Sequence, residues 1–281
     1  MILIKLGGSV ITDKSKPLSA SRPRIAGMAR AIARIKEPAI IVHGGGSFGH
    51  YWSVKYDMHT AERDYDPKGV SVVKNSMVQL NLIILEELLR GGLRPYAMAP
   101  SGFMTGPRPI PSRVREVADI AAASEMTPVT YGDAVWYGDG SKTYILSGDK
   151  IMSHVARIAR PRLCIFALAE DGLYTDMESK RLVERVPAGA GPAAASGLSS
   201  PEGGAMDVTG GMARKVAEAA RIAGYGMEVA LVNGNHPRRI RDAAASGGFR
   251  GTLFEADTAT KDGKRKKSKR TAPKRAKRRI R

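Results

Sequence analysis

Short, almost uninterrupted apolar runs alternate with amphipathic stretches along most of this chain. The apolar runs cover residues 2–6, 39–43, 95–99, 127–131, 163–168 and 228–232. Helical periodicity fills the intervals, at 21–35, 70–90, 148–159, 210–223 and 237–245. Strands that are apolar on both faces and separated by helices are typical of a parallel sheet covered on both sides. The sequence therefore predicts an α/β fold with an open, mainly parallel sheet between two helix layers.

The segment "VWYGDGSKTYIL", residues 135–146, departs from this pattern. Two short β-type runs flank Gly138-Asp139-Gly140, which is a typical hairpin turn. We expect a small β-hairpin here, whose antiparallel strands join the edge of the parallel sheet.

The positive charge of the chain is concentrated at its C-terminal end. The whole sequence of 281 residues has a formal net charge of +18, and residues 257–281 contribute +11 of it. This segment contains almost no apolar side chain, so it cannot bury enough surface to offset the entropy of ordering. We expect one domain over residues 1–256 and a disordered basic tail over 257–281 that could contact polyanions without sequence specificity.

Cysteine content and hydropathy indicate the cell compartment. The single cysteine, Cys164, lies inside an apolar run and cannot form an internal disulfide. The apolar start of the chain is too short for a secretory signal, and no run approaches the ~20 apolar residues of a membrane span. The sequence predicts a cytoplasmic protein without a membrane segment.

Two of the predicted strands lead directly into glycine turns. Run 2–6 is followed by Gly7-Gly8-Ser9, and run 39–43 by Gly44-Gly45-Gly46. Further glycine turns, "DVTGG" and "NGNHP", precede the last two helical stretches. Backbone N–H groups in such turns bind phosphate oxygens well, because no Cβ atom blocks their approach. Several such turns in one chain indicate a polyphosphate ligand.

The known nucleotide motifs fit only in part. The sequence contains no Walker A loop. Gly44-x-Gly46-x-x-Gly49 matches the dinucleotide fingerprint, which also needs an acid at the end of the next strand. Residues 59–69, "HTAERDYDPKG", supply acids but no apolar strand. We therefore favour phosphoryl transfer over nicotinamide chemistry.

Phosphoryl transfer needs positive charge around the transferred group. Lys5 lies inside the first apolar run, Lys14 follows the first glycine turn, and Lys215 lies one turn into the helical stretch at 210–223. Asp149 begins another helical stretch and could hold two such ammonium groups in place. Taken singly, Lys14 and Lys215 also fit ordinary solvated lysines, and Asp149 also fits a helix N-cap.

The glycine-rich segment "HGGGSFGH" has a histidine at each end, His43 and His50. An acceptor phosphate is already ionised near neutral pH and needs no general base, so His50 is best used as a hydrogen-bond donor to it. The alternative for His50 is a helix-face histidine bonded to a carbonyl group. For His43, at the end of a predicted strand, we expect this structural role.

The order and spacing of several motifs resemble the amino acid kinase superfamily, and within it the isopentenyl phosphate kinase family. The resemblance covers about residues 1–254, and "GGGSFGH" is its most specific part. The motifs are "KLGGSVITDK", "VHGGGSFGH", "YGD", "SGDKIM", "EDGLY", "DVTGGMARK" and "LVNGNHP". The resemblance implies ATP and Mg²⁺ as cofactors, a homodimer, and transfer of a phosphoryl group from ATP to isopentenyl phosphate, giving isopentenyl diphosphate for isoprenoid biosynthesis.

The resemblance also implies site residues, with the acceptor site in the N-terminal half and the nucleotide site in the C-terminal half. The catalytic residues would be Lys5, Lys14, His50, Asp149 and Lys215. The acceptor would be bound by Gly45, Gly46, Gly49, His50, Val73 and Ile145. ATP would be bound by Lys5, Gly7, Gly8, Ser9, Asp171, Gly172, Tyr174, Gly210, Gly211 and Lys215. The resemblance assigns no residue as a direct metal ligand.

Three points leave alternatives open. Val70, Val73 and Met77 form an i, i+3, i+7 stripe that fits a pocket wall, plain core or a dimer interface. Leu168-Ala169 replaces the Thr-Asp pair usual in the family, so the way the ribose and base of ATP are bound, and the nucleotide preference, stay open. The alternative functions are a kinase of another small phosphate or phosphonate, as in the fosfomycin kinases, and a nucleotide-binding protein that docks on nucleic acid through its tail.

Overall fold

The computed structural model describes residues 1–13, 15–58, 64–137, 142–175, 181–190, 211–245 and 247–257. Its centre is an eight-stranded sheet with the order β12-β14-β13-β9-β1-β2-β6-β3. The strands are β1 (Ile2–Leu6), β2 (Ala39–His43), β3 (Pro95–Ala97), β6 (Thr127–Tyr131), β9 (Leu163–Leu168), β12 (Arg185–Val186), β13 (Glu228–Asn233) and β14 (Thr252–Phe254). All neighbours are parallel except β13 and β14.

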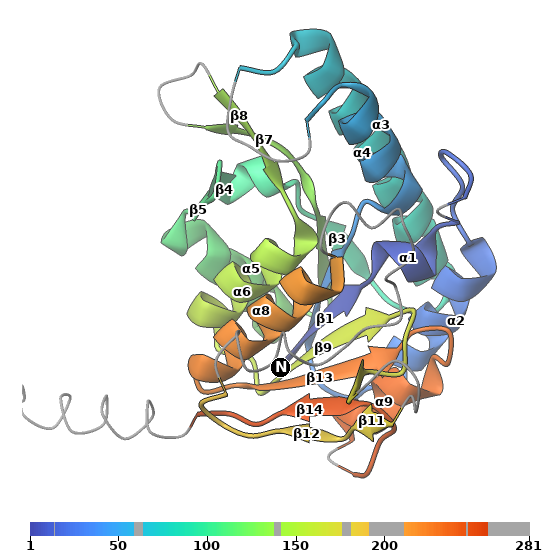
Figure 1. Cartoon of the computed structure of the whole chain (residues 1–281), viewed down its shortest axis with the longest axis vertical. Helices are drawn as coiled ribbons and strands as arrows, with labels where there is room; N and C mark the ends of the chain where they lie inside the picture. Colours follow the sequence, from blue (N-terminus) through green and yellow to red (C-terminus); the bar gives the residue numbers. More distant parts are fainter. Residues whose placement is uncertain are drawn as a thin grey trace, which may run out of the picture.

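Helices cover both faces of this sheet (Figure 1). One layer contains α2 (Arg22–Ile32), α4 (Pro67–Arg90) and α9 (Arg238–Ala244). The other contains α5 (Pro111–Ala123), α6 (Gly148–Ala159) and α8 (Gly211–Gly224). Two further helices, α1 (Gly8–Ile11) and α3 (Gly46–Lys55), start directly at the carboxyl ends of β1 and β2. The predicted α/β fold with a mainly parallel sheet is therefore confirmed.

Smaller elements complete the described structure. The hairpin of β7 (Asp133–Tyr137) and β8 (Lys142–Leu146) packs with β7 against α4 (Figure 1). Two other antiparallel pairs are β4 (Met104–Thr105) with β5 (Arg108–Pro109), and β10 (Leu173–Tyr174) with β11 (Leu182–Val183). A short 3-10 helix, η1, covers Pro100–Gly102.

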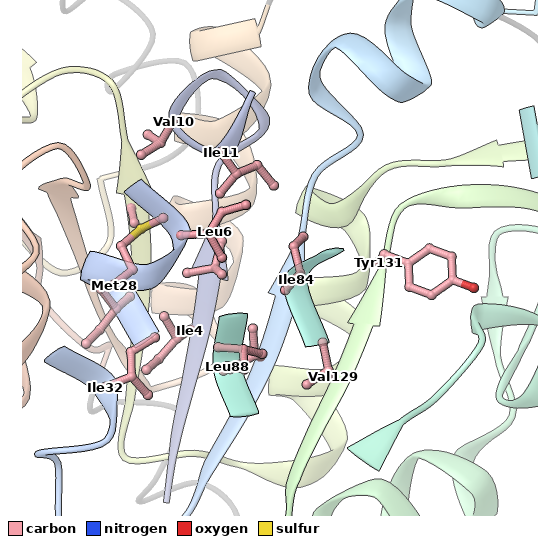
Figure 2. Close-up of a cluster of buried hydrophobic side chains, with 14 of the residues drawn as sticks. Ile4, Leu6, Val10, Ile11, Met28, Ile32, Ile84, Leu88, Val129 and Tyr131 are labelled. Carbon is pink, nitrogen blue, oxygen red and sulfur yellow. The ribbon is translucent and has the colours of Figure 1, made fainter. Parts of the chain in front are cut away.

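Alternation along the central strand β1 divides its side chains between two buried clusters. Ile2, Ile4 and Leu6 pack with residues of α2 and α4, and Figure 2 shows Ile4 and Leu6 among Met28, Ile84 and Leu88 of this cluster. Leu3 belongs to the cluster on the opposite face. Lys5 shares the face of Leu3, because successive strand side chains point to opposite sides. This alternation aims the ammonium of Lys5 toward α6 and the ring of Phe166, 5.8 Å away.

Three details differ from the sequence-based expectation. The β7–β8 hairpin exists, but it forms a separate two-stranded sheet. The antiparallel strand of the main sheet is β14, paired with β13 toward the edge formed by β12. The helix α5 was not predicted, although Pro111 at its start and buried Val114, Val117 and Ala121 are ordinary helix signals.

Other expectations stand as follows. None of the helices in the described ranges is long and apolar enough to cross a membrane. The division into a domain over 1–256 and a tail over 257–281 stays a prediction, and residues 258–281 lie outside the described residues.

Candidate functional site

The glycine turns of the N-terminal half meet at the carboxyl ends of neighbouring parallel strands. β1 pairs with β2 on one side and with β9 on the other. The turn after β1 therefore lies between the turns after β2 and β9, and each turn begins a new helix or loop at the same edge of the sheet. In open α/β sheets this edge is where ligands bind.

The turns after β1 and β2 touch backbone to backbone. A Cβ atom on Gly8 would lie 2.5 Å from the backbone nitrogen of Gly46. A Cβ atom on Gly7 would lie 2.5 Å from the carbonyl oxygen of Ala167. Gly46 has a φ of +48°, a conformation that other residues seldom adopt. Glycine is required at Gly8 and Gly46 because the two turns are packed against each other, and at Gly7 because the end of β9 lies against it.

Side chains also fasten the two turns together. The Thr12 hydroxyl donates to the Gly8 carbonyl at 2.7 Å and accepts from the Ser47 backbone N–H at 2.9 Å. The Ser47 hydroxyl accepts from the Ser19 backbone N–H at 3.1 Å. A hydroxyl bonded on both sides fixes the distance between the start of α1 and the start of α3. The predicted phosphate-binding residues Gly7, Gly8, Gly45 and Gly46 thus form one connected structure.

A buried ion pair lies beside these turns. The ammonium Nζ of Lys5 is 2.5 Å from Oδ1 of Asp149, and the two residues are 3% and 8% exposed. Asp149 lies in the first turn of α6, whose N-cap is Ser147, so the alternative interpretation of Asp149 as the cap is wrong. A Cβ atom on Gly148 would lie 3.2 Å from Cε of Lys5, and glycine leaves room for the lysine stem. A lysine held in this way presents fixed positive charge at the strand ends.

The second histidine of the glycine-rich turn lies on α3. His50 is exposed, one turn after the helix begins at Gly46, and Gly49 precedes it. Gly45 and Gly49 both face the sulfur of Met77, which would lie 3.2 Å from a Cβ atom on either glycine. The turn after β2 therefore rests on α4 through Met77, with exposed His50 one turn into α3.

The first histidine has a structural role, as expected. His43 is fully buried, its Nε2 lies 3.1 Å from the side-chain amide of Asn81, and its ring stacks on Tyr131 at 5.2 Å. Burial lowers the pKa of His43 to about 4 against the opposing effect of its hydrogen bonds to Gly44 and Asn81. His43 is therefore neutral near pH 7 and joins the end of β2 to α4.

Asp171, predicted to bind ATP, is surrounded by hydrogen-bond donors. Its carboxylate accepts from Asn233 at 2.9 Å, from Arg239 at 2.5 Å and from Arg250 at 2.7 Å. Burial alone would raise the pKa of Asp171, but these three hydrogen bonds outweigh it and lower the pKa to about 2. The carboxylate thus joins the "EDG" loop after β9 to the "NGNHP" turn after β13 and to the approach to β14.

The other predicted site residues are distributed as follows. Ser9 lies on α1, Gly172 and Tyr174 follow Asp171 at and before β10, and half-buried Lys215 lies in the first turns of α8. Gly211 is the first residue of α8. Lys14 and Gly210 lie outside the described residues.

The apolar candidates Val73 and Ile145 belong to one cluster, Val73 buried in it and Ile145 half-buried against it. Met77, of the same stripe, is also core.

Sequence reasoning missed several polar residues that hold the site. Asn81, Thr12 and the pair of Lys74 with Asp133 were not singled out, although Asp133 belongs to the "YGD" motif. The available signal for Asp133 was its position just after the buried strand β6. Polar residues at the carboxyl ends of parallel strands gather at one edge of the sheet.

Comparison with known proteins shows the family of the chain. Residues 1–233 match the model of the amino acid kinase family. The chain is 32% identical to an isopentenyl phosphate kinase of Methanothermobacter thermautotrophicus over 90% of this chain and 98% of the relative. It is 30% identical to that of Thermoplasma acidophilum over 90% of this chain and 100% of the relative.

A solved structure gives the same result. The crystal structure of a product complex of the T. acidophilum isopentenyl phosphate kinase superposes with a TM-score of 0.73 and 27% identity, and covers 91% of this chain and 100% of that one. Such relatives are phosphotransferases, and membership of a kinase family implies the use of ATP. The chain belongs to the amino acid kinase family and, within it, to the group of the isopentenyl phosphate kinases.

Proposed function

We propose that this protein transfers the γ-phosphoryl group of ATP to isopentenyl phosphate, forming isopentenyl diphosphate and ADP. The observation that carries the proposal is the contact of Gly8 with Gly46, which makes the turns after β1 and β2 immediate neighbours. One turn would hold the phosphates of ATP and the other the phosphate of the acceptor. Two phosphate-bearing substrates would then meet at one seam, as in-line transfer requires.

The charged residues would have separate tasks at this seam. An oxygen of the acceptor phosphate attacks the γ-phosphorus, and the bond from that phosphorus to the bridging oxygen of ADP breaks. Lys5, held by Asp149, would offset the negative charge on the transferred group. Lys14 would act from the acceptor side and Lys215 from the nucleotide side. His50 would donate a hydrogen bond to the acceptor phosphate from the start of α3, while Val73 and Ile145 would contact its apolar part.

Mg²⁺ is proposed to accompany ATP. The described residues contain no cluster of three or more metal-ligating side chains. This fits Mg²⁺, which in kinases is commonly held by substrate phosphates, waters and only one or two carboxylates. Bound there, the ion would offset phosphate charge during transfer, and Asp149, beside Lys5, is a carboxylate that could contribute to holding it.

Steady-state turnover with ATP and isopentenyl phosphate is the direct test of the function. Formation of isopentenyl diphosphate supports the proposal, and its absence at every enzyme concentration refutes it. Dimethylallyl phosphate, fosfomycin and uridylate as parallel acceptors test the alternative of another small phosphate or phosphonate. In the same assay His50→Ala should raise the KM for isopentenyl phosphate by about tenfold or more, because a hydrogen bond to a charged group is lost. Val54→Ala, at an exposed position of the same helix, is the control.

A homodimer is proposed from the outer face of α4. Val78, Leu82 and Leu89 are 43%, 54% and 60% exposed and lie on one stripe of the helix together with Leu85. Large apolar stripes of this kind are commonly covered by a partner. Sedimentation should give a dimer for the wild type and a monomer for Leu82→Glu. A monomeric wild type would contradict the proposal.

The basic segment 257–281 is proposed to contact polyanions, on the strength of its net charge of +11. Removal of residues 257–281 should abolish salt-sensitive binding to nucleic acid and leave turnover unchanged. Loss of turnover together with binding would favour the alternative that the tail serves the principal function. The cytoplasmic location stays a prediction of the sequence.

A further inference from the structure

An ion pair with a buried carboxylate joins α4 to the β7–β8 hairpin. The ammonium Nζ of Lys74 donates to Oδ2 of Asp133 at 2.6 Å and to the carbonyl oxygen of Ala134 at 3.0 Å. The other carboxylate oxygen of Asp133 accepts from the backbone N–H of Ala134 at 2.8 Å. Both oxygens of Asp133 therefore have partners, and Lys74 is bound to two groups of the same hairpin.

The two members of the pair differ in exposure. The side chain of Asp133 is only 2% exposed, while that of Lys74 is 40% exposed. Burial raises the pKa of Asp133, and the ammonium of Lys74 opposes that effect. A carboxylate this deeply buried is expensive to leave unpaired, whereas exposed ion pairs contribute little. The position of the hairpin is therefore coupled to the position of Lys74.

The pair stands beside the apolar side chains proposed for the acceptor pocket. Lys74 directly follows Val73 on α4, and Ala134 is the cross-strand partner of Ile145. Fixing Lys74 to Asp133 and Ala134 thus fixes the separation of Val73 from Ile145. β7 packs against α4, and Figure 1 shows the hairpin and this helix at the same end of the molecule.

The pair also lies next to the seam between the turns. Gly132, directly before Asp133, donates its N–H to the carbonyl oxygen of His43 at 3.1 Å. A Cβ atom on Gly132 would lie 3.0 Å from the backbone nitrogen of Gly148. The start of the hairpin is therefore packed between the residue that leads into the acceptor turn and the residue that precedes Asp149.

We propose that Lys74 and Asp133 are positioning residues for the acceptor: their ion pair holds the β7–β8 hairpin against α4 and so sets the geometry of the pocket between Val73 and Ile145. The inference rests on the proposed function. The pair acts through these neighbours and not by contact with the reacting atoms. Loss of the pair should raise the KM for isopentenyl phosphate and leave the KM for ATP unchanged. If the pair served stability alone, its loss would not raise one KM more than the other.

The test compares Lys74→Met with the wild type in steady-state assays, with Lys68→Met as the matched control at an exposed lysine of the same helix. The KM for isopentenyl phosphate should rise about tenfold in Lys74→Met, because small misplacements of a substrate are costly, and the KM for ATP should stay within about twofold. Lys74→Arg should restore most of the acceptor KM, since its guanidinium can still pair with Asp133. An unchanged acceptor KM in Lys74→Met overturns the proposal.

A double variant separates positioning from stability. In Lys74→Met/Asp133→Leu no buried charge is left without a partner, so thermal stability should return toward the wild type. The acceptor KM should stay raised, because the hydrogen bonds to the hairpin are gone. A double variant that recovers both stability and the acceptor KM contradicts a positioning role.

Hydrogen exchange makes the result independent of the proposed function. Amides of residues 133–137 and 142–146 should exchange faster in Lys74→Met than in the wild type or in Lys68→Met, as expected when a local link is lost. If the wild type forms no diphosphate, the proposed function fails, and unchanged exchange in Lys74→Met would separately reject the link between the hairpin and α4.

Discussion

Lys5 and Asp149 are separated by 144 positions in the sequence, yet Nζ of one lies 2.5 Å from Oδ1 of the other. The lysine comes from β1 and the aspartate from the first turn of α6. Both are almost completely buried, and so the pair is not screened by water as a surface pair would be. Removal of either member would therefore leave an uncompensated charge inside the protein.

Asp149→Ala should impair both properties. Removal of one member of a buried pair leaves the other uncompensated, and the free energy of unfolding should fall by about 3 kcal/mol. The kcat should fall by about 10²-fold, since Lys5 would no longer be held toward the transferred group. Denaturant unfolding and steady-state kinetics measure these changes. Asp119→Ala, at an exposed aspartate of α5, is the control, and a wild-type kcat in Asp149→Ala would exclude the role assigned to this carboxylate.

The contact between the two glycine turns gives a second prediction. The methyl group of Gly8→Ala would meet backbone atoms of Gly46 at 2.5 and 2.7 Å, which cannot move aside as a flexible side chain would. Overpacking of this kind costs roughly 1–3 kcal/mol, and the separation of the turns should lower kcat/KM for both substrates by about tenfold or more.

Gly224→Ala is the matched control for this variant. No heavy atom lies within 4 Å of a Cβ atom placed on Gly224, which is the last residue of α8. Its unfolding free energy and kinetics should stay close to those of the wild type. Equal behaviour of the two variants would show that the contact between the turns is not needed.

The regular part of the fold could be predicted from the sequence because it depends on local patterns. β1, β2, β6 and β9 begin and end at the predicted residues, since their apolar runs are bounded by turns. β14 was missed because "TLF" is too short to form a recognisable run, and it is specified by its pairing with β13. Strand pairing of this kind depends on residues distant in the sequence.

The candidate site could be predicted less completely. The glycines and Lys5 were identified because backbone freedom and a lysine inside an apolar strand are visible locally. The contacts of Lys74 with Asp133 and of His43 with Asn81 join residues 59 and 38 positions apart. In the local sequence, Lys74 looks like any lysine on a helix surface and Asn81 like any asparagine in a helix. Only the packing of α4 shows that these two residues have buried partners.

His43 makes the stability of the protein depend on pH. Its folded pKa of about 4 lies below the ordinary value of 6.5, because burial disfavours the charged ring. The unfolded chain therefore binds a proton between these values that the folded chain does not, and stability falls as the pH falls from 6.5 to about 4. This histidine should contribute a loss of roughly 3 kcal/mol across that window.

The measurement is the free energy of unfolding of His43→Gln and wild type at several pH values between 7 and 4. The variant should show a shallower fall, although not a flat one. His154 titrates in the same window, because burial and the charges of Lys150, Arg157 and Arg221 lower its pKa to about 4. Parallel curves for His43→Gln and wild type would contradict the prediction, and His236→Gln controls for the loss of a histidine.

Asp171 gives a prediction at lower pH. Its folded pKa of about 2 is below the ordinary 3.8, so its stabilising effect is present above pH 3.8 and is lost as the pH falls toward 2. Asp171→Asn should therefore reduce the free energy of unfolding by about 2 kcal/mol at pH 7, and the difference from the wild type should shrink between pH 4 and 2. Urea unfolding at pH 7, 4 and 2.5 measures this change.

The same variant tests the nucleotide side of the site. Asp171 holds Asn233 and Arg239, and these residues place the turn after β13 against the loop after β9. Loss of the charge should loosen that turn and raise the KM for ATP severalfold, while the KM for isopentenyl phosphate stays near the wild-type value. If the acceptor KM rose instead, Asp171 would belong to the acceptor side, and the assignment of the nucleotide site to the C-terminal half of the chain would be wrong.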